Sequence, residues 1–199
     1  LVGSEMCIRD RWYSTTEGET PKIKLMDSIG REIKTYEGVQ SVDTDVETVV
    51  DNGTTYTLYP CKVTVTDLTE NTSYQYQYYV NGAWSDTYSY KTQSTESFSI
   101  MYVGDPQIGA STGQIKGENK EYFAMNDSYN WYHTLNNAVS KFPDLSFIMS
   151  AGDQINQSSV SKDADKLEQQ IEYAGFLNPT VLRSLPVAVT IGNHDSKSV

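Results

Sequence analysis

Three times along this chain, an apolar segment ends in a glycine that is followed at once by a side chain able to bind a metal ion. These pairs are Gly104-Asp105, Gly152-Asp153 and Gly192-Asn193. Open α/β sheets bind ligands beyond the carboxyl ends of their strands, and glycine lets the backbone turn sharply there. Two carboxylates and an amide oxygen, all hard metal ligands, would then be aimed at one point. A single Gly-Asp is a weak signal, but three in succession are a strong one.

The elements expected to position these residues alternate between strand and helix. Nearly continuous apolar runs at 98–103, 145–149 and 185–191 lead into the three glycines, as expected of buried parallel strands. Helical patterns cover about 129–141 and 163–177, and Trp131, Leu135 and Val139 fall on or near one face of the first. The second half of the chain is therefore predicted to be an α/β domain.

The first half, from Trp12 to about Gln93, has the texture of β-structure. Patterns at 23–25, 57–65, 74–80 and 88–91 are β-rich or alternating, and turn residues bound them. Short strands at this spacing predict a sandwich of about 80 residues. Leu68, Thr72 and Tyr74 have the spacing of a tyrosine corner, in which the phenol hydrogen-bonds backbone just upstream.

The segment from residue 63 to residue 85 resembles the fibronectin-III-like domain that precedes the catalytic domain of purple acid phosphatases. That family often has proline two residues after the leucine of the corner, where this chain has Glu70. A generic β-sandwich is the alternative interpretation.

The three strand-end motifs resemble the signature of the metallophosphoesterase (calcineurin-like) superfamily. They are 104–109 (Gly-Asp-Pro-Gln-Ile-Gly), 152–156 (Gly-Asp-Gln-Ile-Asn) and 192–195 (Gly-Asn-His-Asp). The resemblance implies an all-β fibronectin-III-like sandwich at 12–95 and, at 97–199, the N-terminal part of an α/β metallophosphoesterase domain, a truncated β-sandwich with flanking helices. It also implies a hydrolase of phosphate monoesters or diesters that acts on small-molecule substrates.

Residue roles follow from the same resemblance. Asp105 would bind the first metal ion, Asp153 would bridge two, and Asn193 would bind the second through its side-chain oxygen. Two such ions, drawn from Fe, Zn and Mn, would activate a water for attack on phosphorus. His194, paired with Asp195, would donate to the phosphoryl oxygens or the leaving group.

The chain departs from the family pattern at several places. Gln107 stands where many relatives have a ligating histidine, and it could bind a metal ion weakly. Asn156 stands where purple enzymes have an iron-binding tyrosine, so an uncoloured metal pair is expected. The family takes three further histidine ligands from later strands, but His133 is the one other histidine here and is interpreted as a packed or surface residue. The chain as given is therefore predicted to be an inactive fragment.

Residues 1–11 have neither the apolar core of a signal peptide nor a strand pattern. Residues 6–10 (Met-Cys-Ile-Arg-Asp) look like the translation of a transposon-end sequencing adapter, so residues 1–11 are interpreted as a non-native segment. Without Cys7, Cys61 would be the single native cysteine, expected as a buried structural thiol.

Composition limits the function classes. The net charge of −11 and the pI of about 4.5 argue against a nucleic-acid partner, which would need a basic surface. No apolar run approaches the roughly 18 residues of a membrane span. Tyrosine- and threonine-rich acidic chains with few cysteines are often exported, so an extracellular or cell-envelope location is expected. The alternative function is a catalytically degenerate surface protein that binds a partner through its sandwich, an interpretation that Gln107 favours and the intact 192–195 motif opposes.

Overall fold

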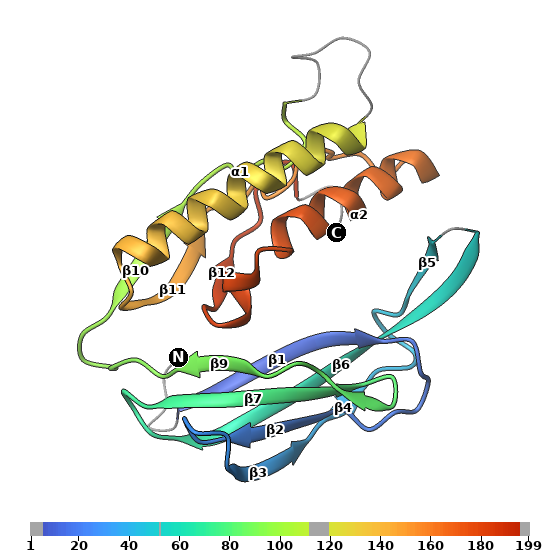
Figure 1. Ribbon diagram of the computed structural model, residues 1–199. Coiled ribbons are helices and arrows are strands. Elements are labelled where there is room, and N and C mark those ends of the chain that lie inside the picture. Colours follow the sequence, from blue (N-terminus) through green and yellow to red (C-terminus); the bar gives the residue numbers. More distant parts are fainter. Residues whose placement is uncertain (1–5, 52, 112–119, 196–199) are drawn as a thin grey trace. The chain divides into compact units, whose positions relative to one another are not determined.

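In the computed structural model, residues 6–51, 53–111 and 120–195 are described (Figure 1). By their internal contacts the residues separate into two units, Leu1–Thr95 and Glu96–Val199. The regular elements among the described residues of the first unit are all strands, and those of the second alternate strands with helices. None of the described helices is long and apolar enough to cross a membrane.

Two antiparallel sheets make up the first unit. One has the order β1-β6-β4, with β5 also paired to β6, and the other has the order β3-β2-β7-β8, with β9 paired to β7. The strands are β1 (Met6–Ser14), β2 (Lys22–Met26), β3 (Glu32–Glu37), β4 (Val39–Gln40), β5 (Glu47–Asp51), β6 (Thr54–Leu68), β7 (Ser73–Val80), β8 (Ala83–Trp84) and β9 (Tyr88–Lys91).

The core of this unit follows from alternation along β6. Cys61, Val63 and Val65 are buried while Lys62 and Thr64 between them are exposed, because successive side chains of a strand point to opposite faces. The buried face packs against apolar side chains of the other sheet, namely Ile23, Leu25 and Tyr74.

The tyrosine corner contact is present. The Tyr74 hydroxyl accepts a hydrogen bond from the backbone N–H of Thr69 at 2.9 Å, and the ring is buried. Cys61 is also buried, as predicted, and burial raises the pKa of its thiol.

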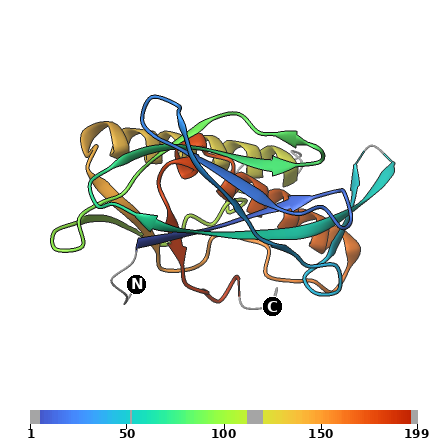
Figure 2. The ribbon, with the colours of Figure 1, turned by 90° about the horizontal axis from the view of Figure 1, so that it is seen from below.

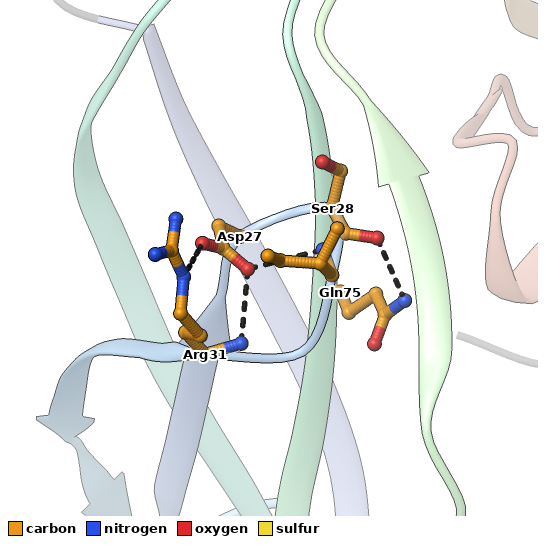
Figure 3. Close-up of polar contacts among 5 residues, drawn as sticks. Asp27, Ser28, Arg31 and Gln75 are labelled. Carbon is orange, nitrogen blue, oxygen red and sulfur yellow. Dashed lines mark hydrogen bonds and ion pairs between the residues drawn. The ribbon is translucent and has the colours of Figure 1, made fainter.

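A polar turn joins β2 to β3 (Figure 3). Asp27 Oδ1 accepts from the backbone N–H groups of Ile29 and Arg31 at 3.0 and 2.9 Å, and Oδ2 accepts from Arg31 Nε at 2.7 Å. Gln75 on β7 donates to the Ser28 carbonyl at 3.2 Å. The backbone and side-chain hydrogen bonds from Arg31 lower the pKa of the Asp27 carboxyl.

The N-terminal segment differs from expectation. Residues 6–11, predicted to lack a strand pattern, continue β1 and pair with β6, from Met6 opposite Leu68 to Arg11 opposite Lys62 (Figure 2). Strand pairing uses backbone groups that every residue except proline supplies, so the long edge of β6 can order a segment without a strand-like pattern. Residues 1–5 of the expected adapter-derived segment lie outside the described residues.

The second unit has the element order β10 (Ser99–Val103), α1 (Lys120–Lys141), β11 (Leu145–Ser150), α2 (Asp163–Leu177), a 3-10 turn (Thr180–Arg183) and β12 (Val187–Val189). The strands form a parallel sheet in the order β10-β11-β12. Helix α1 begins earlier than the predicted 129, and β12 is shorter than the predicted 185–191.

Both helices pack against the same core. Trp131 and Leu135 on α1, Phe176 on α2 and Ile148 on β11 belong to one buried cluster, and the Trp131 and Phe176 rings stack at 5.5 Å. Ile100 and Tyr102 of β10 are exposed. A facing second sheet, which the expected truncated sandwich would contain, is not seen in residues 96–111 and 120–195.

Candidate functional site

The three strand-end turns lie side by side, with Asp153 between the other two. Where β10 and β11 end, the Ala151 N–H donates to the Val103 carbonyl at 2.8 Å. The Gln107 N–H donates to the backbone carbonyl of Asp153 at 2.9 Å. On the other side, the His194 N–H donates to Asp153 Oδ1 at 2.8 Å. The first, second and third motifs are therefore all joined through residue 153.

The motif residues adopt an unusual backbone conformation. Asp105 and Asp153 both have φ of +49° and Gln107 has +33°, in the left-handed region that costs a non-glycine residue about 1–3 kcal/mol. Of Gly104, Gly152 and Gly192, the glycines that directly precede the candidate ligands, Gly152 alone has a positive φ, at +108°. The sharp turns were expected at the glycines, but in the first motif the turn is made by the aspartate. Aspartate tolerates this conformation better than most residues.

Gly192 has a different role, which is to let the third motif approach Asp153 closely. A Cβ at residue 192 would lie 2.7 Å from Asp153 Cγ and closer still to Asp153 Oδ1 and N. The third motif can contact the Asp153 side chain because residue 192 lacks a side chain.

Beyond the turns, the two loops pair with each other. The Ile108 N–H donates to the Gln154 carbonyl and the Asn156 N–H donates to the Ile108 carbonyl, both at 3.1 Å. Ile108 and Ile155 form an isolated parallel bridge and are fully buried. This bridge extends the β10–β11 pairing past the turns and fixes the base of the site.

His194 has a defined ring orientation. Its Nδ1 lies 2.5 Å from the Asn156 carbonyl oxygen, which can only accept, so Nδ1 carries the proton and Nε2 remains available. The ring was predicted to pair with Asp195, whereas the structure pairs it with a backbone carbonyl. Asn156, expected to replace a metal-binding tyrosine, contributes its peptide groups here.

Asp195 is 2 % exposed, and its carboxylate accepts hydrogen bonds from backbone N–H groups. Its Oδ1 accepts from the Gln154 N–H at 3.1 Å and from the Tyr173 hydroxyl at 3.4 Å, and its Oδ2 accepts from the Gly192 N–H at 2.9 Å. These bonds tie the third motif to the second. Asp195 was expected to pair with His194, but it bonds the backbone N–H groups of Gln154 and Gly192 instead, because buried amides need acceptors.

Two acidic residues of the helices hold the loops and were not singled out from the sequence. Asp127 on α1 accepts from the N–H groups of Gly109 and Ser111 at 3.0 and 3.1 Å. Glu172 on α2 accepts from those of Asn156 and Gln157 at 2.9 and 2.7 Å. The available signal was spacing, because Glu168, Glu172 and Phe176 recur every four residues on the buried face of a helix.

The donor set fits part of a metal centre. Asp105 and Asn193 are exposed, Gln107 is half-buried, and all offer hard oxygen ligands. Asp153 uses Oδ1 for the His194 amide, which leaves Oδ2. Within the described residues, no three His, Cys, Asp or Glu side chains gather as a metal site. His133 is exposed on α1 and contacts the rings of Tyr129 and Tyr132, in line with its interpretation as a packed or surface residue.

Proteins similar to this chain are found among solved structures. No family model matches the chain, and no curated protein matches it. Among solved structures, it is similar to a purple acid phosphatase isolated from yellow lupin (Lupinus luteus) seeds, with a TM-score of 0.58 and 16 % identity. The match covers 94 % of this chain and 33 % of that protein, so the chain spans about a third of its length. Over nearly its whole length, the chain therefore shares a fold with a purple acid phosphatase.

Proposed function

We propose that this chain is part of a metal-dependent phosphoric ester hydrolase, of the metallophosphoesterase type, acting on small phosphate esters. The observation that carries the proposal is the convergence of the three motif turns on Asp153. Three sequence-distant turns meet there with two of them in strained left-handed conformations, and such strain clusters at functional sites.

The proposed roles follow from the ligand chemistry of each side chain and from its place at the three turns. Asp105, Asp153 through Oδ2 and Asn193 would hold two metal ions, with Gln107 as an additional weak ligand. Bound metal ions supply a water activated for attack on phosphorus. His194 would present Nε2 to the phosphoryl oxygens or the leaving group, since Nδ1 is held by the Asn156 carbonyl. Asp195 would keep the 192–194 turn against the second motif.

We further propose that Leu1–Thr95 contains a fibronectin-III-like domain. Its two antiparallel sheets and the Tyr74–Thr69 corner contact support this assignment. An experimental structure in which the order or pairing of these strands departs from that of a fibronectin-III domain would overturn it.

The test of the enzymatic proposal is hydrolysis of p-nitrophenyl phosphate by the complete product of the reading frame, with Mn²⁺ or Zn²⁺ added, beside the 199-residue chain. Asp153→Asn keeps the shape of the side chain and removes its charge, so it should abolish turnover and metal retention. Tyr79→Phe, a change in the first unit, should leave both unaltered. Absence of turnover with every metal between pH 4 and pH 9, together with no retained metal by elemental analysis, would refute the proposal.

A second candidate function is a non-catalytic binding protein with a degenerate site. It is favoured by the lack of a three-residue His, Cys, Asp or Glu cluster in the parts of the chain described. Its distinguishing result is a folded, metal-free protein in which Asp153→Asn changes no measurable property except stability.

A further inference from the structure

We propose that Glu172 is a positioning residue for His194, acting through the peptide group that joins Asn156 to Gln157. The consequence for catalysis rests on the proposed function, but the structural link stands without it. Glu172 is outside every motif, lies on α2 and is 1 % exposed.

The link is a continuous chain of hydrogen bonds across one planar group. Glu172 Oε2 accepts from the Gln157 N–H at 2.7 Å. The carbonyl of that same peptide unit belongs to Asn156, and its oxygen accepts from His194 Nδ1 at 2.5 Å. A peptide group is rigid and conjugated, so orientation at its nitrogen fixes its oxygen. The hydrogen bond that the Gln157 N–H donates to Glu172 also makes the carbonyl oxygen of the same peptide group a better acceptor, because hydrogen bonds in such chains strengthen one another.

The surroundings are built to keep Glu172 in this place. A Cβ on Gly109 would lie 2.6 Å from Glu172 Cδ, and Gly109 has φ of +100°, so only glycine leaves room for the carboxylate. The same Oε2 also accepts from the Asn156 N–H at 2.9 Å. A carboxylate buried this deeply is costly unless bonded in this way.

Neighbouring groups hold the loop but do not reach the histidine. Glu168 accepts from the Gln157 side chain at 2.6 Å, and the Gln169 side chain donates to the Gln157 carbonyl at 2.7 Å. Both contacts act on atoms other than the peptide group between residues 156 and 157. Tyr173 on α2 donates to Asp195, the residue after His194 in the chain. Glu172 supplies the contact from α2 that ends on the peptide group bonded to the His194 ring.

The consequence is a fixed tautomer. With Nδ1 donating to the Asn156 carbonyl, the neutral ring exposes an unprotonated Nε2, which can take up a proton and deliver it to a leaving group. In water, a free histidine side chain favours the opposite tautomer. Glu172 thus has the role expected of Asp195, exerted across a backbone peptide.

The experiment is ¹⁵N NMR of the 199-residue chain labelled at histidine, at a pH where both imidazoles are neutral. The ring nitrogen shifts of the two histidines report tautomers directly, and His133 is the internal reference. We expect the Nδ1–H form for His194 in the wild type and a shift toward Nε2–H in Glu172→Ala. Glu172→Gln, which keeps an oxygen acceptor, should retain the Nδ1–H form.

Asp127→Ala is the matched control, since it removes a helix carboxylate that also holds two loop amides. Its hydrogen-bonded path runs through the Ile108–Gly109 peptide and ends at the Asn156 N–H, not at the peptide group that joins Asn156 to Gln157. It should leave the His194 tautomer unchanged. If Glu172→Ala does not fold, Glu172→Asp, one methylene too short, takes its place. An unchanged tautomer in the folded Ala or Asp variant overturns the proposal, and so does an equal change in Asp127→Ala.

The NMR measurement needs neither metal nor substrate, so it tests the role of Glu172 separately from the proposed hydrolase activity. In an active protein, Glu172→Ala should lower kcat about 10-fold or more with little change in KM, as expected when a proton donor is misplaced. Glu172→Gln should recover most of kcat.

Discussion

Replacing Gly192 by alanine should displace Asp153, the residue on which the three turns converge. The added Cβ would lie 2.7 Å from Asp153 Cγ, whereas ordinary contacts begin at 3.4 Å, so the two must separate by about 0.7 Å. Part of the clash is with the Asp153 backbone nitrogen, which cannot rotate away. Overpacking of this kind costs about 1–3 kcal/mol, which corresponds to a urea midpoint lower by about 0.5–1.5 M.

The assay combines urea unfolding with hydrogen exchange of the His194 amide, which donates to Asp153 Oδ1 at 2.8 Å. Displacing the acceptor should remove the protection of that amide before the global transition. Gly104→Ala is the matched control, because it alters the equivalent glycine of the first motif, where the nearest atom to an added Cβ is Ala151 Cβ at 3.8 Å.

Gly104→Ala should change the free energy of unfolding by no more than about 0.5 kcal/mol, as expected where the added Cβ meets no close neighbour. Wild-type stability and full His194 protection in Gly192→Ala would refute the geometric argument. So would equal losses in the two variants, since the clash exists at one position and not at the other.

Three further predictions concern the first unit. Tyr74→Phe leaves the Thr69 amide without its acceptor and should lower the free energy of unfolding, measured in urea, by about 1–3 kcal/mol. Tyr79→Phe should change that free energy very little. Equal losses in the two variants would contradict the role of the Tyr74–Thr69 hydrogen bond. Cys61 should resist a thiol reagent in native protein and react on unfolding, because its thiol is buried and its pKa is raised; peptide-resolved mass spectrometry that finds it modified at native pH would contradict this. Asp27 has a lowered pKa, so its stabilising contribution is present above the pKa of an unfolded carboxyl and disappears as the pH falls through the folded pKa. The difference in unfolding free energy between wild type and Asp27→Asn should be constant from pH 5 to 7 and should shrink below about pH 4. A difference that grows in acid would contradict the assignment.

Elements with a strong hydrophobic period could be read from the sequence. Strand β9 was predicted with its observed bounds, and β11 and α2 nearly so, because apolar runs and helical spacing report burial directly. β3, β4 and β5 were missed, and their side chains are mostly exposed or half-buried. A strand that buries few side chains shows little alternation of apolar and polar residues in its sequence. Its pairing depends on backbone groups, which the amino-acid composition does not reveal.

The motifs located the turns of the site but not the partners of their side chains. Types and spacing brought residues 105, 153 and 193 to neighbouring turns, because parallel strands end at one edge of a sheet. The assignment of Asp195 to His194 came from adjacency in sequence. In the structure, the acceptor for His194 is a carbonyl from the second motif, reached across 38 residues of chain. Backbone acceptors carry no residue identity, so a sequence pattern cannot single one out.

The acidic residues around the site separate into two kinds by what their oxygens already accept. Asp127, Glu172 and Asp195 each accept from two backbone N–H groups, which occupies about two of the roughly four lone pairs of a carboxylate and leaves fewer for a cation. Asp153 accepts from one, through Oδ1. An acidic residue near the site is thus a poor ligand candidate when it already bonds two amides.

This division also explains how the turns can be held without the proposed metal ions. Each amide-binding carboxylate joins a loop to a helix or to another loop, so the turns are fixed by bonds that a metal ion does not have to supply. Removing metal should therefore leave the exchange protection of the Gln154, Gln157 and Gly192 amides unchanged, and only the environment of residues 105, 153 and 193 should respond. Loss of protection at those amides on metal removal would mean that the ions, and not the buried carboxylates, organise the turns.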